Sequence, residues 1–224
     1  MDAAWQGLKV IEGVQMIAND ADFPGGQPGR DLLLAAMGYD GSGHRGGGIE
    51  RPRVELLPAG AMLIRFYKPV EAAGEHPGDF GAWWFTPHEY RRICDYFGVD
   101  GRALIVDRSA GRSGLHGVLA LLHEWYGGSP AQLALVNAVR LKSPLRCCYG
   151  PGAPANADRY ARTLKPVRLG NGQAARQVYL HRAWMYQDAM VRLLPKAAST
   201  DAVFGRVGGL PPEIAQAQRL GFET

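Results

Sequence analysis

An arginine inside an apolar run is the first residue whose position indicates chemistry. Arg65 lies in the segment 61–67, AMLIRFY, whose apolar and aromatic residues between Gly60 and Pro69 predict a buried strand. A guanidinium in such a strand is costly unless it is paired or reaches a wet cleft. We therefore expect either a fixed fork for a phosphate or carboxylate, or a structural ion pair or a side chain reaching out from a sheet edge.

The segment GAWWFT leads directly into a predicted helix. Thr86, Pro87 and Glu89 have the spacing of a capping box, in which Thr86 is the N-cap, Pro87 is the first helical residue and Glu89 reaches back to the Thr86 N–H. Trp83 and Trp84 precede the cap in an extended segment, so their side chains should point to opposite faces. One indole can then enter the core while the other lines a cleft, unless both are core aromatics.

A strand with a lone arginine, a variable loop, and then Gly-x-Trp-Trp-x-Thr opening a helix resembles the front half of the mono-ADP-ribosyltransferase toxin fold. In that family the first-strand arginine holds the NAD phosphates, and a strand containing serine or threonine shapes the nicotinamide pocket. The resemblance implies an α+β fold of two small packed sheets with flanking helices and an NAD-binding cleft between the sheets. It implies that NAD is the substrate and that Arg65, Phe66, Trp83, Trp84 and Thr86 bind it.

A late strand of that family normally carries the catalytic glutamate, often two residues after a Gln or Glu. A carboxylate there stabilises the oxocarbenium-like transition state that forms as the nicotinamide–ribose bond breaks. The corresponding strand here, 176–180, contains Gln177 and no acid. The resemblance therefore places Gln177 with Arg65 at the catalytic position, although a neutral amide stabilises a cation less well. The other interpretation is that Gln177 faces solvent on an edge strand. Acids available elsewhere are Glu124, Asp188 and Glu213.

The composition is that of one globular domain. The chain has 224 residues, of which 46% are hydrophobic and 21% charged, and no internal repeat or low-complexity boundary divides it. We expect a single α+β domain over residues 1–224, with a helical, glycine-rich segment at 1–50 and a candidate NAD-binding core at 51–224. The net charge of +4 and the isoelectric point of about 9.0 favour an anionic ligand such as a dinucleotide, and they also permit nucleic acid.

Cysteine usage and hydropathy indicate the compartment. The three cysteines include an adjacent pair, which argues against a disulfide framework, and no ligand spacing indicates structural zinc. The first residues lack the regions of a secretory signal, and no apolar run approaches membrane-spanning length. We expect a cytoplasmic protein without a metal or a membrane span, or one exported by a route that does not use a cleaved signal.

A second candidate nucleotide site lies at residues 103–126. A predicted strand at 103–106, the loop RSAGRSGLHG and a helical run at 118–126 have the layout of a phosphate cradle. The loop lacks the ending of a P-loop and the G-x-G-x-x-G spacing, so a flexible connection is the better interpretation. His116 and His123 can share a helix face, but no third metal ligand stands at a convincing spacing.

The remaining patterns predict short elements of both kinds. Apolar periodicity, Gly and Pro set their boundaries. The predicted helices are 1–20, 30–37, 183–194 and 212–220; the predicted strands are 54–57, 132–141 and 145–149; the predicted loops are 38–48 and 150–156.

These observations lead to three functional hypotheses. The first is an effector- or toxin-like enzyme that transfers ADP-ribose from NAD to a protein or nucleic-acid acceptor. The second is a non-enzymatic binding or inhibitor protein that uses a basic, arginine-rich surface on an acidic partner or nucleic acid, and the missing glutamate favours it. The third is another nucleotide-dependent transferase built on the 103–126 unit.

Overall fold

The computed structural model describes residues 16–39, 47–67, 80–97, 135–157, 162–166, 168–169, 172–196 and 198–199. Several predicted features lie outside the described residues. They are the 103–126 unit with His116, His123 and Glu124, most of the helix predicted at 1–20, and the helix predicted at 212–220 with Glu213.

Two four-stranded antiparallel sheets, a small two-stranded antiparallel sheet and a few helices make up the described fold, so the α+β class is confirmed. The strands are β1 (Arg53–Leu57), β2 (Met62–Tyr67), β3 (Trp83–Trp84), β4 (Leu135–Leu141), β5 (Leu145–Pro151), β6 (Ala155–Ala157), β7 (Arg162–Leu164), β8 (Arg176–Tyr179), β9 (Met190–Arg192) and β10 (Ala198–Ser199). The helices are α1 (Arg30–Ala36) and α2 (Pro87–Phe97), with 3-10 turns η1 (Asp20–Asp22), η2 (Pro24–Gly26) and η7 (Ala183–Ala189).

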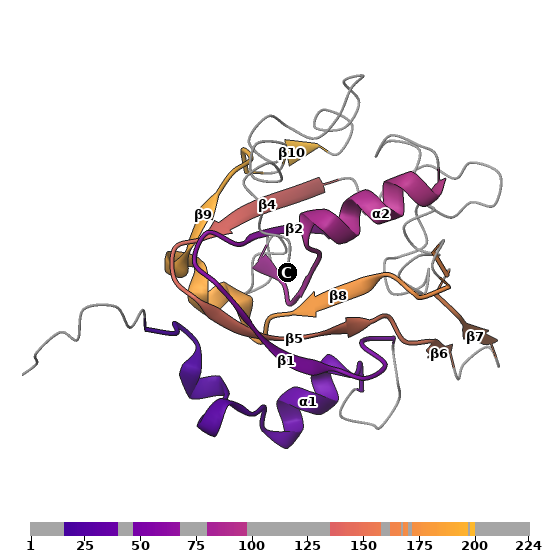
Figure 1. Cartoon of the computed structure of the whole chain (residues 1–224), viewed down its shortest axis with the longest axis horizontal. Coiled ribbons are helices and arrows are strands. Elements are labelled where there is room, and N and C mark those ends of the chain that lie inside the picture. The colour runs from indigo at the N-terminus through magenta and orange to yellow at the C-terminus, as the bar shows by residue number, and fades with distance from the viewer. Residues whose placement is uncertain are drawn as a thin grey trace, which may run out of the picture.

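The two larger sheets meet at the residue that follows β3. The first sheet has the strand order β1-β5-β8-β3, and the second has β10-β4-β2 with β9 also paired to β4. The main-chain groups of Phe85 and Ile64 exchange two hydrogen bonds of 2.8 Å, which join the end of β3 to β2. In Figure 1 the first sheet lies beside α1 and the second lies beside α2. One short extended segment with both tryptophans therefore connects the sheets.

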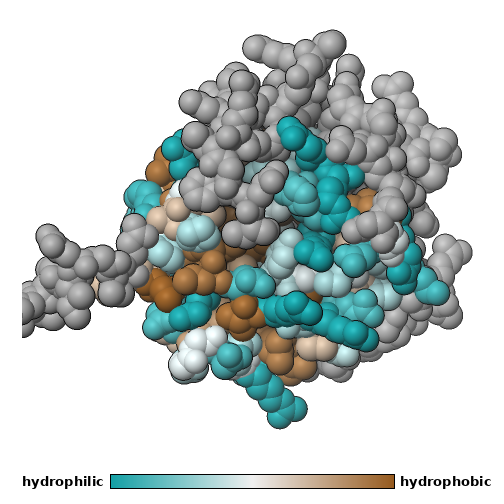
Figure 2. All heavy atoms as spheres, in the orientation of Figure 1, coloured by the Kyte–Doolittle hydropathy of each residue, from teal (hydrophilic) through white to brown (hydrophobic). Residues whose placement is uncertain are grey.

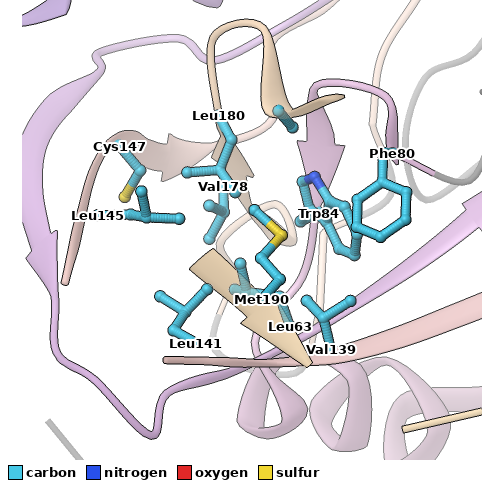
Figure 3. Packing of buried hydrophobic residues seen from close by; sticks show 11 residues of the cluster. Leu63, Phe80, Trp84, Val139, Leu141, Leu145, Cys147, Val178, Leu180 and Met190 are labelled. Atoms are coloured by element: carbon cyan, nitrogen blue, oxygen red, sulfur yellow. The ribbon is translucent and has the colours of Figure 1, made fainter. Parts of the chain in front are cut away.

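Apolar side chains from both sheets fill the space between them. Leu63 of β2, Val139 of β4 and Val178 of β8 belong to one buried cluster, which also contains Trp84. Figure 3 shows these side chains converging from the two sheets, with Met190 of β9 among them. Removing this apolar surface from water contributes roughly 25 cal/mol per Å² to stability. The sheets are therefore held together by a packed core.

A second cluster packs α1 against the other face of the first sheet. Leu32 and Ala36 of α1 contact a set of buried residues that includes Cys148 and Tyr179. Cys147, the neighbour of Cys148, belongs to the cluster between the sheets, because successive residues of a strand point to opposite faces. The first sheet is thus covered on both faces.

Most predicted elements that fall on described residues are present, one is wrong and another is wrong in part. The helix predicted at 183–194 is instead the turn η7 followed by strand β9. β9 pairs with β4, with Met190 opposite Leu141 and Arg192 opposite Val139. Pairing to an available strand edge has overridden the local apolar periodicity. The loop predicted at 150–156 is also wrong in part, because β5 continues to Pro151 and β6 begins at Ala155.

The visible surface is mixed in character. In Figure 2 the residues of the face in view alternate between hydrophilic and hydrophobic, with many hydrophilic residues on the side of α2. The exposed large hydrophobic residues of the described segments are Met16, Leu56, Met185 and Val191.

Candidate functional site

Arg65 lies at the junction of the two sheets. It stands on β2 opposite Asn137 of β4, and its Nη1 donates a hydrogen bond of 2.7 Å to the main-chain oxygen of Trp83. Gly81 leaves room for the guanidinium, since a Cβ at that position would collide with it. The Arg65 side chain is partly exposed. The guanidinium is therefore held in one place by the chain and still reaches the surface.

The two tryptophans lie on opposite faces, as the extended segment predicts. Trp84 is 0% exposed and its Nε1 donates a hydrogen bond of 2.7 Å to the carbonyl oxygen of Gly81. Trp83 is partly exposed, and its ring meets that of Tyr179 edge-on with 4.8 Å between the centroids. Trp84 is thus a core residue, whereas Trp83 packs against the cluster beneath α1 and is only partly exposed.

Phe66 packs away from the guanidinium of its neighbour. Its side chain is 8% exposed, and its ring lies 6.5 Å from that of Phe85 and 5.8 Å from that of Tyr90. Neighbouring strand residues point to opposite faces, so Phe66 lies on the α2 side of β2 while Arg65 lies on the other side. The structure places Phe66 in the core beneath α2.

Thr86 caps α2 as predicted. Its Oγ1 accepts a hydrogen bond of 3.2 Å from the N–H of Glu89, and Pro87 is the first residue of the helix. The reciprocal half of the capping box is wrong, because the Glu89 carboxylate binds Arg92 and the main chain of Arg176 instead of the Thr86 N–H. The partly buried guanidinium of Arg92 and the main-chain N–H of Arg176 bind this carboxylate instead.

Replacing Thr86 by alanine should lower the free energy of unfolding by about 1 kcal/mol, because the N–H of Glu89 loses its acceptor. Urea denaturation measures this loss, and Thr86→Ser, which keeps the hydroxyl, should retain most of the stability. Equal midpoints for the wild type and Thr86→Ala would show that the side-chain cap is not formed.

Gln177 lies on an interior strand. β8 is paired on one side with β5 and on the other with β3, so the alternative of a solvent-facing residue on an edge strand is wrong. The side chain is 6% exposed, and within the described part of the chain its Nε2 has no hydrogen-bond acceptor. Gly152 is close enough that an added Cβ would lie 3.0 Å from this nitrogen. A buried amide donor without an acceptor costs about 1–3 kcal/mol.

Glu89 is a buried ion-pair residue that the sequence reasoning assigned only to the helix cap. It is 0% exposed, and its two oxygens accept hydrogen bonds of 3.0 and 2.8 Å from Nη1 of Arg92. The main-chain N–H of Arg176 donates to the same carboxylate at 2.8 Å. The Arg176 guanidinium in turn lies over the ring of Tyr149, 5.9 Å from its centroid. Glu89 therefore links the first turn of α2 to β8 at Arg176, the residue before Gln177.

A second arginine lies near the junction and was also missed. The guanidinium carbon of Arg192 on β9 is 5.0 Å from the ring centroid of Phe80. Phe80 directly precedes Gly81, which borders the Arg65 guanidinium. Two guanidiniums thus flank the segment that enters β3. Because the sequence pattern around Arg192 was interpreted as a helix, only the pairing of β9 reveals this position.

The structure therefore brings only some of the predicted site residues close together. Arg65, Trp83 and the cap residue Thr86 follow one another along the junction, and Gln177 shares a strand face with Tyr179, which contacts Trp83. Between the sheets, Trp84 and its neighbours fill the space where a cleft was expected. Among the acids considered, Asp188 is exposed on η7. The accessible part of the candidate site is the edge formed by Arg65 and Trp83.

The described segments contain neither an activated thiol nor a group of metal ligands. Cys147 and Cys148 are free and buried, and burial raises the pKa of the Cys148 thiol to about 11 and that of Cys147 further. Such thiols are poor nucleophiles at neutral pH. Within the described segments no group of His, Cys, Asp and Glu side chains is placed to hold a metal ion. None of the helices described is long and apolar enough to cross a membrane.

Comparisons with known proteins leave the chain without a family. No protein-family model matches it, and no curated protein matches it. One similar solved structure is described as Rhs1-CT in complex with cognate immunity protein RhsI1; it is 15% identical, covers 75% of this chain and 95% of its own, and gives a TM-score of 0.40. A TM-score this low does not transfer a fold or a function, so the proposals below depend on the residues of this chain.

Proposed function

We propose that this protein binds NAD at the edge formed by Arg65 and Trp83 and transfers ADP-ribose to a macromolecular acceptor, as an effector- or toxin-like enzyme. The observation that carries the proposal is the direct bond from the Arg65 guanidinium to the main chain of Trp83, 2.7 Å long. Trp83 in turn pairs with β8, the strand that holds Gln177. The three sequence segments that resemble the transferase family are thus neighbours.

Each residue would have a distinct task. The Arg65 guanidinium offers charge-assisted hydrogen bonds to phosphate oxygens, and Arg192, across the Phe80–Gly81 segment, adds positive charge on the same side. The partly exposed Trp83 ring supplies an aromatic surface for the nicotinamide. The buried Nε2 of Gln177 donates to a ribose hydroxyl, while NAD itself supplies the leaving nicotinamide.

The non-enzymatic binding protein is the second candidate, and a specific observation favours it. By the resemblance Gln177 stands where the family has its glutamate, and the carboxylate of Glu89 on α2 is already bound by Arg92 and Arg176. A neutral amide cannot offset the positive charge that develops on the ribose as a carboxylate does. In this alternative the Arg65 edge would hold an acidic partner or nucleic acid without turnover.

Replacing Gln177 by glutamate separates the two candidates. If Gln177 faces the ribose, a carboxylate there should raise nicotinamide release from NAD by about tenfold or more, which is a barrier lower by about 1.4 kcal/mol. Release is followed at equal concentrations of folded wild type and variant. Gln27→Glu, the same change at an exposed position, is the matched control and should leave the rate unchanged.

A folded Gln177→Glu variant that releases nicotinamide no faster than wild type would remove Gln177 from the catalytic position. The substitution also buries a carboxylate, which costs stability unless the group is paired. Unfolding curves are therefore recorded for both variants, and the rates are compared at a temperature where both are native.

A further inference from the structure

A groove between α1 and the turn after β8 contains charged groups that the NAD site does not use. Its volume is about 290 Å³, and its lining includes Asp22, Arg30, Asp31, His181 and Arg182. It lies on the α1 face of the first sheet, where Tyr179 of β8 is followed by Leu180 and then His181. The groove is large enough for a small organic ligand.

Arg182 has a strained backbone at the edge of this groove. Its φ of 47° and ψ of 45° lie in the left-handed region. Among the described residues other than glycine, Arg182 alone has a positive φ. Side chains with a Cβ rarely adopt this conformation, and such strain often marks functional positions. Arg182 and Arg30 are both exposed at the groove. Within the described part of the chain, neither guanidinium has a carboxylate at ion-pair distance.

The neutral ring of His181 can donate a hydrogen bond from Nε2. The Tyr179 hydroxyl lies 3.3 Å from Nδ1 of His181, and burial raises the pKa of Tyr179 to about 12, so the hydroxyl keeps its proton and can donate it. With the hydroxyl as donor, Nδ1 accepts and the neutral ring carries its hydrogen on Nε2; the other tautomer reverses both roles. Burial lowers the pKa of His181, which favours the neutral ring.

A hydrogen bond from a tyrosine hydroxyl also orients the carboxylate of Asp22. The Tyr186 hydroxyl donates a hydrogen bond of 2.6 Å to its Oδ2, which leaves Oδ1 as an acceptor. Asp31, at the start of α1, is exposed at the same groove. The groove therefore combines cationic donors with carboxylate acceptors, which suits a ligand that carries an anionic group and hydroxyl groups together.

We propose that this groove is a binding site for a small phosphorylated molecule that also carries hydroxyl groups. Arg30 and Arg182 hold the phosphate, which two guanidiniums recognise better than a single ammonium would. His181 donates from Nε2, and Asp22 and Asp31 accept from the hydroxyls. None of these five residues belongs to the edge formed by Arg65 and Trp83, although Tyr179 contacts both the Trp83 ring and His181.

Calorimetric titration of the full chain with ribose 5-phosphate tests this proposal. Ribose 5-phosphate should bind, and ribose without the phosphate should not. Arg182→Gly should weaken ribose 5-phosphate binding about tenfold or more, while its unfolding midpoint stays equal to or above that of wild type, because glycine adopts a positive φ without strain. Arg30→Gln should weaken binding to a similar extent. Arg53→Gln, an exposed arginine of β1 outside the groove, should bind as wild type does.

Three results would overturn the proposal. The first is no binding of ribose 5-phosphate to the wild type. The second is unchanged affinity in folded Arg182→Gly and Arg30→Gln. The third is binding that is lost in Arg65→Ala but kept in Arg182→Gly, since the phosphate would then occupy the NAD site. A failure of NAD to bind, with ribose 5-phosphate still bound through Arg182, would contradict the proposed function and leave this groove in place.

Discussion

Replacing Arg65 by alanine should weaken NAD binding by about 10- to 100-fold. A hydrogen bond to a charged group contributes about 1.5–3 kcal/mol, and each 1.4 kcal/mol is a factor of ten in the dissociation constant. The guanidinium is already positioned by its 2.7 Å bond to the carbonyl oxygen of Trp83, so it binds phosphate without a further loss of side-chain freedom. Isothermal titration calorimetry with NAD measures the change.

Matched variants separate the role of the guanidinium from that of the fold. Arg65→Lys keeps the charge but loses the planar fork, and should fall between wild type and Arg65→Ala. Gly81→Ala leaves Arg65 in the sequence and displaces its guanidinium, because the new Cβ would collide with it; it should also weaken NAD binding. Arg53→Ala, on exposed β1, should not. Equal NAD affinity in folded Arg65→Ala and wild type would exclude Arg65 from the site.

Replacing Glu89 by alanine should lower the free energy of unfolding by about 3–5 kcal/mol. The substitution removes one member of a buried ion pair and leaves the Arg92 guanidinium and the main-chain N–H of Arg176 without their acceptor. The loss should be large because the Glu89 side chain is 1% exposed and that of Arg92 only 22%. Urea denaturation followed by fluorescence gives the difference.

His88 provides the control for this experiment. It precedes Glu89 on the same turn of α2 and is exposed, so His88→Ala should change stability by less than about 0.5 kcal/mol. Glu89→Gln keeps an oxygen for the Arg176 amide and should be less destabilising than Glu89→Ala. A loss below about 1 kcal/mol in Glu89→Ala would mean that the contact between α2 and β8 contributes little to stability.

Local patterns in the sequence predicted much of the fold. The apolar and aromatic composition of 61–67 predicted β2, and the Thr86-Pro87 pair predicted the start of α2. These features depend on neighbouring residues only, which is why composition and spacing are enough to find them. The opposite faces of Trp83 and Trp84 follow from extended geometry in the same way.

Features that depend on distant partners were not predicted. β9 forms because β4 offers it an edge, and nothing in the residues around Met190 indicates that pairing. Glu89 belongs by spacing to the helix cap, but its carboxylate binds β8, whose residues lie far along the chain. The bond from Arg65 to the Trp83 carbonyl likewise exists only because Phe85 and Ile64 join the sheets. Tertiary pairing decides such cases, and local propensity does not.

Calorimetric titration of the wild-type protein with NAD tests the central claim most directly. We expect a saturable heat of binding. We also expect the unfolding temperature to rise with NAD concentration, because a ligand that binds only the native state stabilises it. Both effects should be clearly weaker in Arg65→Ala. No binding of NAD to folded wild-type protein, or binding that Arg65→Ala leaves unchanged, would contradict the claim.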